Sequence, residues 1–296
     1  MRIVIAGSSG YLGGALVSRL HEHGHDVVRL VRREALTDDQ VEWDPYRKPF
    51  DPAVLDGADA VVNLCGAGVG DKRWTPAYKG LIQASRLEPT RILAEAVAAA
   101  KVPVLLNGSA VGYYGDGGAL SEVDESAPAA DDYLGRLARS WEAAASPAVE
   151  AGARVVFLRT THVFGPGALM LKKLVPLFKL GLGGRFGSGE QYLPWISLLD
   201  WTRAVEFLLT HDVSGPVNLA GPTPITNRDF ATALAAALGR KAPFAVPGFA
   251  LRAGAGEAAV ELLRGVKVRP RALEDAGFVW EHASLTDTLG WALEKR

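Results

Sequence analysis

The stretch that decides the fold runs from Arg2 to Gly13 and reads RIVIAGSSGYLG. Residues 2–6 are a short run rich in β-branched apolar side chains, which is typical of a buried strand in a parallel sheet. Glycines punctuate the next seven residues, and an apolar pattern at helical spacing then continues to Leu20 and stops before Gly24. The stretch therefore predicts a strand, a glycine-rich turn and a helix.

The same alternation of strand and helix continues along the chain. Further strands are predicted at 27–31, 40–43, 60–64, 102–106, 154–158 and 217–220, and helices at 76–100, 131–151 and 198–211. Strands that alternate with helices favour an α/β fold in which right-handed crossovers build a doubly wound parallel sheet, the Rossmann fold.

The pattern changes after Gly165. Helices are predicted at 168–180 and 226–238, and residues 181–189 hold five glycines, which we interpret as a loop that lines a substrate cleft, with Gln191 and Trp195 as candidate ligands. We expect residues 1–165 and 196–221 to form the Rossmann domain. Residues 166–195 and 222–296 are expected to form a smaller, largely C-terminal substrate-binding lobe.

Composition excludes several classes of protein. The 296 residues are 48% hydrophobic and 22% charged with a formal net charge of −1, which is typical of a globular chain and favours neither a nucleic-acid partner nor a membrane partner. No apolar run reaches the ~20 residues of a membrane-spanning helix, and the N-terminal stretch lacks the features of a signal peptide. We therefore expect a cytoplasmic protein.

Metal and disulfide chemistry are not predicted either. The one cysteine, Cys65, cannot form an internal disulfide or a multi-cysteine zinc site. His21 and His25 have the spacing of helical metal ligands, but Gly24 is expected to end the helix between them. We predict no metal site.

The glycine turn has the spacing of a phosphate-binding loop. Gly7 would allow the tight turn, Gly10 would let a pyrophosphate approach the backbone, and Gly13 would let the helix pack closely on the strand. The helix N-terminus offers free N–H groups and the positive end of its dipole. Together with Ser8, Ser9, Tyr11 and Leu12, these glycines predict a dinucleotide site, whereas the alternative is an ordinary glycine-rich turn.

The end of the second strand favours NADP(H) over NAD(H). Sites for NAD usually carry an acidic residue there, which binds the ribose 2′-hydroxyl. This chain instead has Arg32 and Arg33, and a guanidinium suits a 2′-phosphate. The alternative is that both arginines are solvated surface charges, partly neutralised by Glu34.

With these residues in view, the chain resembles the short-chain dehydrogenase/reductase superfamily in its extended, sugar-nucleotide-epimerase-like form. More closely, it resembles an atypical branch of NAD-dependent epimerase/dehydratase family proteins whose reaction is unassigned. Matching stretches run almost from end to end, and they include residues 7–13, 62–66, 71–74, 85–86, 109–115, 141–142, 158–159, 180–189 with 191, 195–196, 215–218, 266–270 and 276–278.

The resemblance implies cofactor contacts beyond the turn. Leu64, Cys65 and Gly66, at the end of the fourth strand, should line the adenosine ribose. Arg86 should reach a phosphate or a ribose from the following helix, and Val163 should lie near the nicotinamide. The plain alternative for Cys65 is a small buried apolar residue.

The catalytic set departs from the superfamily pattern. The resemblance implies a Ser or Thr after the fifth strand, then a YxxxK pair in which the Tyr is the acid/base and the Lys lowers its pKa and holds the nicotinamide ribose. Ser109 fits the first position and Tyr133 the second, but Leu137 stands where the Lys should be. Tyr113, beside Ser109, is the other candidate phenol, and for each tyrosine the alternative is a packed aromatic.

Two functions fit these observations. In the first, the protein is an oxidoreductase or epimerase-like enzyme that uses NADP(H) on a small polar, sugar-like substrate. In the second, it is a catalytically degenerate NADP(H)-binding protein that serves as a sensor or partner. The missing lysine favours the second function, whereas the second lobe favours the first.

Overall fold

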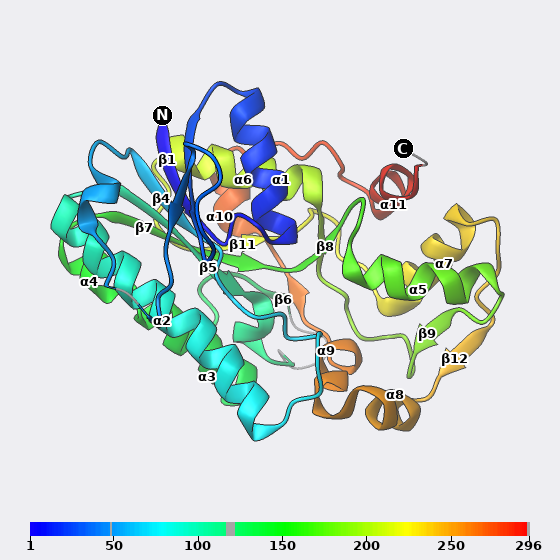
Figure 1. Cartoon of the computed structure of the whole chain (residues 1–296). Coiled ribbons are helices and arrows are strands. Elements are labelled where there is room, and N and C mark those ends of the chain that lie inside the picture. The colour runs from blue at the N-terminus through cyan, green and yellow to red at the C-terminus, as the bar shows by residue number, and fades with distance from the viewer. Residues whose placement is uncertain (48, 117–121, 295–296) are drawn as a thin grey trace.

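A parallel sheet forms the centre of the molecule in the computed structural model, which describes residues 1–47, 49–116 and 122–294 (Figure 1). Its seven strands stand in the order β11-β7-β5-β4-β1-β2-β3, and all neighbours run parallel. They are β1 Arg2–Ala6, β2 Asp26–Val31, β3 Gln40–Glu42, β4 Ala60–Asn63, β5 Val104–Ala110, β7 Arg154–Thr160 and β11 Gly215–Leu219. The predicted doubly wound α/β fold is confirmed.

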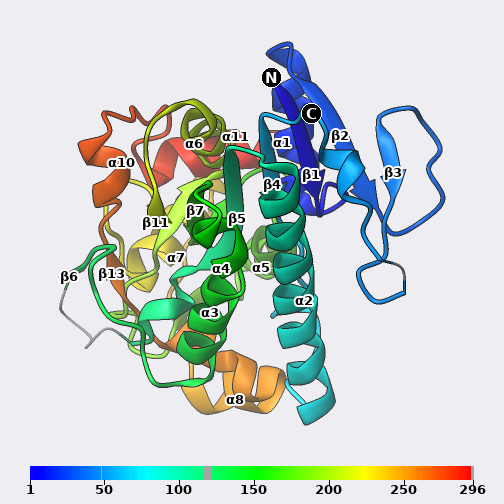
Figure 2. The same ribbon diagram turned by 90° about the vertical axis from the view of Figure 1, so that its left-hand side faces the viewer.

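Helices cover both faces of this sheet (Figure 2). One face carries α1 (Tyr11–Glu22), α6 (Leu198–Thr210) and α10 (Arg271–Asp275). The other carries α2 (Pro76–Ala100), α3 (Tyr133–Ala143) and α4 (Ser146–Glu150). The short 3-10 helix η1 (Pro52–Leu55) also packs beside α2.

Strand β1 shows why the sheet needs both layers. Ile3 and Ile5 are fully buried in the core with α1 and α6, and Val4 and Ala6 are fully buried in the core with α2 and α4. Side chains alternate between the faces of a strand, so a strand that is apolar at every position needs cover on both sides.

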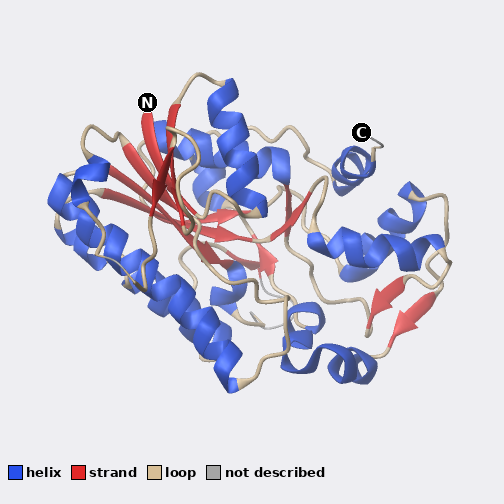
Figure 3. Cartoon of the chain, viewed as in Figure 1, coloured by secondary structure: helices blue, strands red, loops and turns tan. Residues whose placement is uncertain are grey.

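A second apolar core lies beyond the end of the sheet, to the right in Figure 3. It is formed by α5 (Leu169–Lys179), α7 (Asn227–Ala237) and α11 (Leu285–Leu293). Phe164 and Phe230 stack at its centre with their rings 5.1 Å apart. Leu273 and Phe278 instead join the core of the main sheet, and the predicted division into two lobes stays a prediction.

Short elements complete the described chain. Three two-stranded sheets pair β8 (His162–Phe164) with β10 (Trp195–Ser197), β9 (Gly184–Phe186) with β12 (Phe244–Val246), and β6 (Glu122–Val123) with β13 (Lys267–Val268). The remaining helical segments are η2 (Val111–Tyr114), α8 (Gly248–Ala255), η3 (Gly256–Ala259) and α9 (Val260–Leu263). Within the described residues, no helix combines the length and the apolar character needed to cross a bilayer.

The order of the strands marks the place where a ligand is expected. The chain builds β2 and β3 to one side of β1, then β4, β5, β7 and β11 to the other. Ligands of such open sheets bind beyond the carboxyl ends of the strands, where this order reverses. Here that position lies between β1 and β4, directly beside the glycine turn.

Candidate functional site

The packing of the turn itself requires two of its glycines. Gly7 has a φ of +80°, and a Cβ there would lie 2.6 Å from the carbonyl carbon of Leu64. A Cβ on Gly13 would lie 2.3 Å from the carbonyl oxygen of Gly7. Gly7 therefore lets the turn lie against β4, and Gly13 lets α1 lie against the turn.

Gly10 differs, because the chain leaves room beside it. Its φ is −76°, and a Cβ there would meet only the carbonyl oxygen of Gly7, at 3.4 Å. No side chain caps the N-terminus of α1, and the Oγ of Ser8 is buried without a hydrogen-bond partner. Free donors beside an open glycine fit an anionic phosphate group at this helix end.

The other residues of the turn surround this helix end. Ser9 is exposed, and Leu12 packs against the core of the main sheet. The hydroxyl of Tyr11 lies beside the loop after β8, where a Cβ on Gly165 would be 3.0 Å from it. Tyr11 is 39% exposed as a whole, and partial desolvation raises the pKa of its hydroxyl.

Two arginines follow β2. Arg32 is exposed and makes no hydrogen bond or ion pair within the described part of the chain. Burial raises the pKa of Cys65 to about 12, and the charge of Arg32 opposes this rise. Arg32 therefore lies near the end of β4, as a 2′-phosphate ligand should, whereas Arg33 donates to the carbonyl oxygen of Glu34 at 3.2 Å.

A largely buried arginine of α2, Arg86, packs against the backbone that follows β4. A Cβ on Gly66 would lie 3.2 Å from the Cζ of Arg86, so the guanidinium packs directly on this backbone. Its Nη1 donates to the carbonyl oxygens of Ala67 and Ile82, at 2.9 and 3.0 Å. Burial lowers the pKa of Arg86, and no carboxylate pairs with it in the described ranges.

The strand β8 brings two further residues toward the carboxyl ends of the sheet. Val163 pairs with Ile196 of β10 and packs against the core of the main sheet. Its neighbour His162 is desolvated, which lowers its pKa to about 4. His162 is therefore a neutral imidazole at physiological pH.

Ser109 belongs to a charged network that sequence reasoning missed. Its hydroxyl donates to Oε1 of Glu142 on α3 at 2.7 Å. Arg159 of β7 holds the same carboxylate through two bonds, of 2.8 and 2.9 Å. Ser109 and Arg159 are register partners in β5 and β7, and a charged residue directly after the apolar run 155–158 was the signal in the sequence.

Arg159 also reaches the two tyrosines that follow β5. It donates to the hydroxyl of Tyr114 at 2.8 Å, and that hydroxyl donates to Oδ1 of Asn218 at 2.7 Å. Its Cζ lies 3.5 Å from the centre of the Tyr113 ring. The Tyr113 hydroxyl has no hydrogen-bond partner among the residues that the structure describes, so it is the free phenol beside Ser109.

Tyr133 lies apart, at the first turn of α3. Its ring packs against Trp74 with centroids 5.2 Å apart, and its hydroxyl donates to the carbonyl oxygen of Lys79 at 3.3 Å. Burial raises the pKa of Tyr133, and the charges of Lys79 and Arg86 oppose this rise. The structure brings Ser109 and Tyr113 together around Arg159 and places Tyr133 in a different cluster.

The two ligands expected after the glycine-rich segment make hydrogen bonds within the protein. Trp195 is 1% exposed in the second core, and its indole N–H donates to the carbonyl oxygen of Thr223 at 3.0 Å. The Gln191 amide donates to the carbonyl oxygens of Phe186 and Leu262 at 3.0 and 3.1 Å. Their side-chain N–H donors are therefore used within the protein, and their role as substrate ligands stays a prediction.

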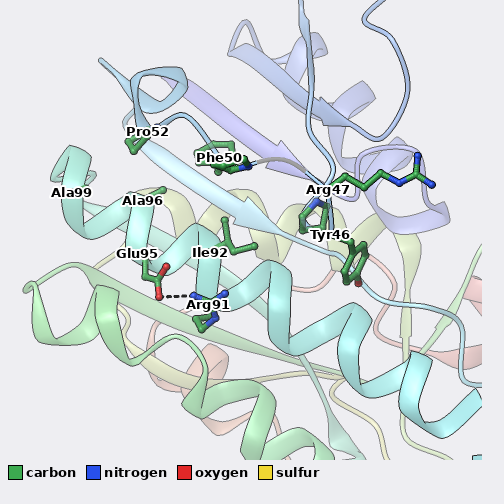
Figure 4. A pocket seen from close by; sticks show the side chains of 11 residues that line it. Tyr46, Arg47, Phe50, Pro52, Arg91, Ile92, Glu95, Ala96 and Ala99 are labelled. Atoms are coloured by element: carbon green, nitrogen blue, oxygen red, sulfur yellow. Dashed lines mark hydrogen bonds and ion pairs between the residues drawn. The ribbon is translucent and has the colours of Figure 1, made fainter. Parts of the chain in front are cut away.

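A pocket of about 560 Å³ lies between the loop after β3 and the outer side of α2 (Figure 4). Tyr46 and Phe50 border it on one side, and Ile92 and the ion-paired Arg91 and Glu95 border it on the other. None of the residues predicted for cofactor binding or catalysis lines this pocket. Within the described chain, no group of three or more potential metal ligands occurs.

Comparisons with known proteins agree with this geometry. Residues 3–220 match the family model described as the NAD dependent epimerase/dehydratase family, and residues 246–292 match a domain of unknown function, DUF1731. An epimerase family protein of Mycobacterium bovis is 46% identical over 98% of this chain and 97% of its own length.

Two solved structures are similar to this chain at 32% identity. The human epimerase family protein SDR39U1, solved with NADPH, superposes with a TM-score of 0.91 over 99% of both chains. The nucleoside-diphosphate sugar epimerase of Corynebacterium glutamicum superposes with a TM-score of 0.81 over 99% of this chain and 58% of that chain.

Proposed function

Because the chain belongs to the NAD-dependent epimerase/dehydratase family, we propose that it binds NADP(H) at the glycine turn. The observation that carries the proposal is the uncapped N-terminus of α1 beside the open Gly10 and the orphaned Ser8 hydroxyl. The proposed contacts are Gly7, Ser8, Ser9, Gly10, Tyr11, Leu12, Gly13, Arg32, Arg33, Leu64, Cys65, Gly66, Arg86 and Val163.

The preference for NADP(H) rests on Arg32. This arginine has no carboxylate partner in the described chain, and it lies near Cys65 at the adenosine end of the proposed site. An unpaired guanidinium there suits a dianionic 2′-phosphate and offers nothing comparable to a 2′-hydroxyl. The NADPH in the human relative agrees with this preference.

The substitution Arg32→Ala tests the proposal. We expect NADPH binding to weaken by about 10- to 100-fold, because a hydrogen bond to a charged group contributes ~1.5–3 kcal/mol. NADH binding should hardly change. Both affinities are measured by titration of the intrinsic fluorescence, and equal affinity of the unsubstituted protein for NADPH and NADH would reject the preference.

We further propose that the protein is an oxidoreductase or epimerase of a small polar, sugar-like substrate. NADP(H), when bound, supplies the redox chemistry. Ser109 gives its own proton to Glu142, so toward a substrate hydroxyl its oxygen acts as an acceptor. Tyr113 carries the free phenol of the network, and we assign it the proton transfer, with Tyr133 as the second candidate.

A metabolite screen that follows the absorbance of bound NADPH tests this activity. Once a substrate is found, Tyr113→Phe should lower kcat by about 10²- to 10⁴-fold, the usual contribution of general acid–base catalysis. Tyr133→Phe is the matched control and should retain most of the activity. The reverse result would move the proton transfer to Tyr133.

The contacts of two candidate groups favour a second function, that of a catalytically degenerate NADP(H)-binding sensor or partner. The Ser109 proton is committed to Glu142, and the Tyr133 hydroxyl donates to a backbone carbonyl. Tight NADPH binding with no turnover across the metabolite screen would support this alternative.

A further inference from the structure

Arg86 is a cation without a counter-ion. Its side chain is largely buried, its pKa is lowered by burial, and no carboxylate of the described chain forms an ion pair with it. Removing a charge from water costs several kcal/mol unless a partner compensates. Two backbone carbonyl oxygens, of Ala67 and Ile82, bind only its Nη1.

The other nitrogens of this guanidinium are available to a ligand. Nε and Nη2 of Arg86 have no hydrogen-bond partner among the described residues. Neither atom is among the fully buried polar atoms, so both are accessible from outside the protein. Because Nη1 and the stem are fixed against Gly66, the free edge is held in one orientation.

The position of Arg86 in the sheet shows which half of a dinucleotide it faces. The glycine turn follows β1, and Arg32 lies on the side of β2. Arg86 packs at the end of β4 and over Trp141 of α3, 5.0 Å from the ring centre, on the side of β5. A dinucleotide with its 2′-phosphate at Arg32 and its pyrophosphate at the turn would place its nicotinamide half on this side.

The same guanidinium lies beside the face of α3 on which a lysine is missing. Tyr133, Leu137 and Trp141 are spaced four residues apart, so they share one face of the helix. Arg86 lies over Trp141 at one end of this face, and its charge acts on Tyr133 at the other. Leu137 stands between them.

We propose that Arg86 replaces the missing lysine from a different helix and binds the nicotinamide ribose through its free guanidinium edge. This inference rests on the proposed NADP(H) site. Guanidinium N–H groups would donate to the ribose hydroxyls and to the adjacent phosphate. Arg86 is thus a binding and positioning residue that acts on the reactive half of the cofactor.

The substitution Arg86→Gln tests the assignment with two ligands. NADPH contains the nicotinamide ribose, whereas 2′,5′-ADP contains only the adenosine half with its 2′-phosphate. We expect Arg86→Gln to weaken NADPH binding by about 10- to 100-fold, as for a charge-assisted hydrogen bond, and to change 2′,5′-ADP binding by less than about twofold. Isothermal calorimetry measures both affinities.

Two further variants keep the result interpretable. Arg91→Gln removes an exposed arginine on the same helix, which is paired with Glu88 and Glu95, and it should leave both affinities unchanged. Arg86→Lys keeps the charge without the planar fork and should bind NADPH with intermediate affinity. This variant also tests the assignment if Arg86→Gln does not fold. Unaltered NADPH binding, or equal weakening of both ligands, would overturn the assignment. If the unsubstituted protein did not bind NADPH, the proposed function would fail instead.

Discussion

Gly10 and Gly13 belong to one turn, but glycine is needed at the two positions for different reasons. At Gly13 a side chain would overlap the backbone of Gly7 and Ser8, with contacts of 2.3 and 2.8 Å. At Gly10 the nearest protein atom would stand 3.4 Å away, and the backbone φ of −76° suits any residue. The fold therefore requires Gly13, whereas only a ligand over the helix end would require Gly10.

Substitutions at the two glycines should separate binding from stability. We expect Gly10→Val to abolish NADPH binding while it costs no more than about 1 kcal/mol of stability, because Val is only a poorer N-cap than Gly. Gly13→Ala should cost about 1–3 kcal/mol through overpacking. Thermal unfolding and fluorescence titration measure the two effects.

Gly14→Ala is the matched control, because a Cβ there would meet only the carbonyl oxygen of Ser8, at 3.8 Å. It should keep NADPH binding and should not lower stability, because Ala is favoured over Gly within a helix. A folded Gly10→Val protein with normal NADPH affinity would show that the phosphates bind elsewhere.

Single residues also show where sequence reasoning stops. The glycine turn was predictable because its spacing follows from the local path of the backbone. The partners of Ser109 were not, because Glu142 lies 33 residues further along the chain and Arg159 lies on another strand. Parallel pairing of β5 with β7 brings these residues together, and only the three-dimensional register reveals it.

At the level of elements, local pattern predicted the long helices well and their interruptions poorly. The helix predicted at 76–100 is α2, with those bounds. The helix predicted at 131–151 is two helices, α3 and α4, and α4 has Pro147 in its first turn. Proline has no N–H to donate and suits the first turn of a new helix, so Pro147 marks the start of α4. The apolar spacing continues across the break between the two helices and therefore did not reveal it.

Short strands in the second half of the chain escaped prediction for a different reason. Residues 181–189 were expected to be a loop, but Gly184–Phe186 forms β9 and pairs with β12 about sixty residues later. A Cβ on Gly184 would lie 2.2 Å from the carbonyl oxygen of Phe244. That glycine permits a close approach of strands, and a three-residue strand has no periodicity of its own to detect.

At the scale of the whole molecule, polar contacts dock residues 248–265 on the main body. Arg264 pairs with Asp132 at the N-cap of α3 at 2.5 Å, and Lys79 of α2 pairs with Glu257. Arg73 donates to the carbonyl oxygen of Ala253 at 2.5 Å. Helices α8 and α9 have no buried side chain of their own among the described residues, whereas Ala259 of η3 between them is fully buried. These polar contacts therefore act together with the apolar packing of η3.

Arg264 is the most buried member of this set, since its side chain is 11% exposed. It also pairs with Glu261 at 3.2 Å. Burial raises the pKa of Glu261, and the charge of Arg264 opposes the rise. Removal of the cation would leave two carboxyl groups, Glu261 and Asp132, without their shared partner.

We therefore expect Arg264→Met to lower the free energy of unfolding by about 1.5–3 kcal/mol at pH 7, the range for hydrogen bonds to charged groups. A carboxyl whose pKa is raised on folding stabilises the fold below its unfolded pKa of about 4.3 and loses that contribution as pH rises through its folded pKa. The loss of Arg264 raises the folded pKa of Glu261 further. The deficit of the variant should therefore shrink between about pH 7 and pH 4, as Glu261 becomes protonated.

Urea unfolding at several pH values measures this deficit. Arg228→Met is the matched control, because Arg228 pairs with Glu190 but its side chain is 51% exposed, and exposed pairs contribute ~0–1 kcal/mol. An Arg264→Met deficit that equals the control, or that grows toward acid pH, would show that Arg264 does not hold residues 248–265 against α3 by its charge.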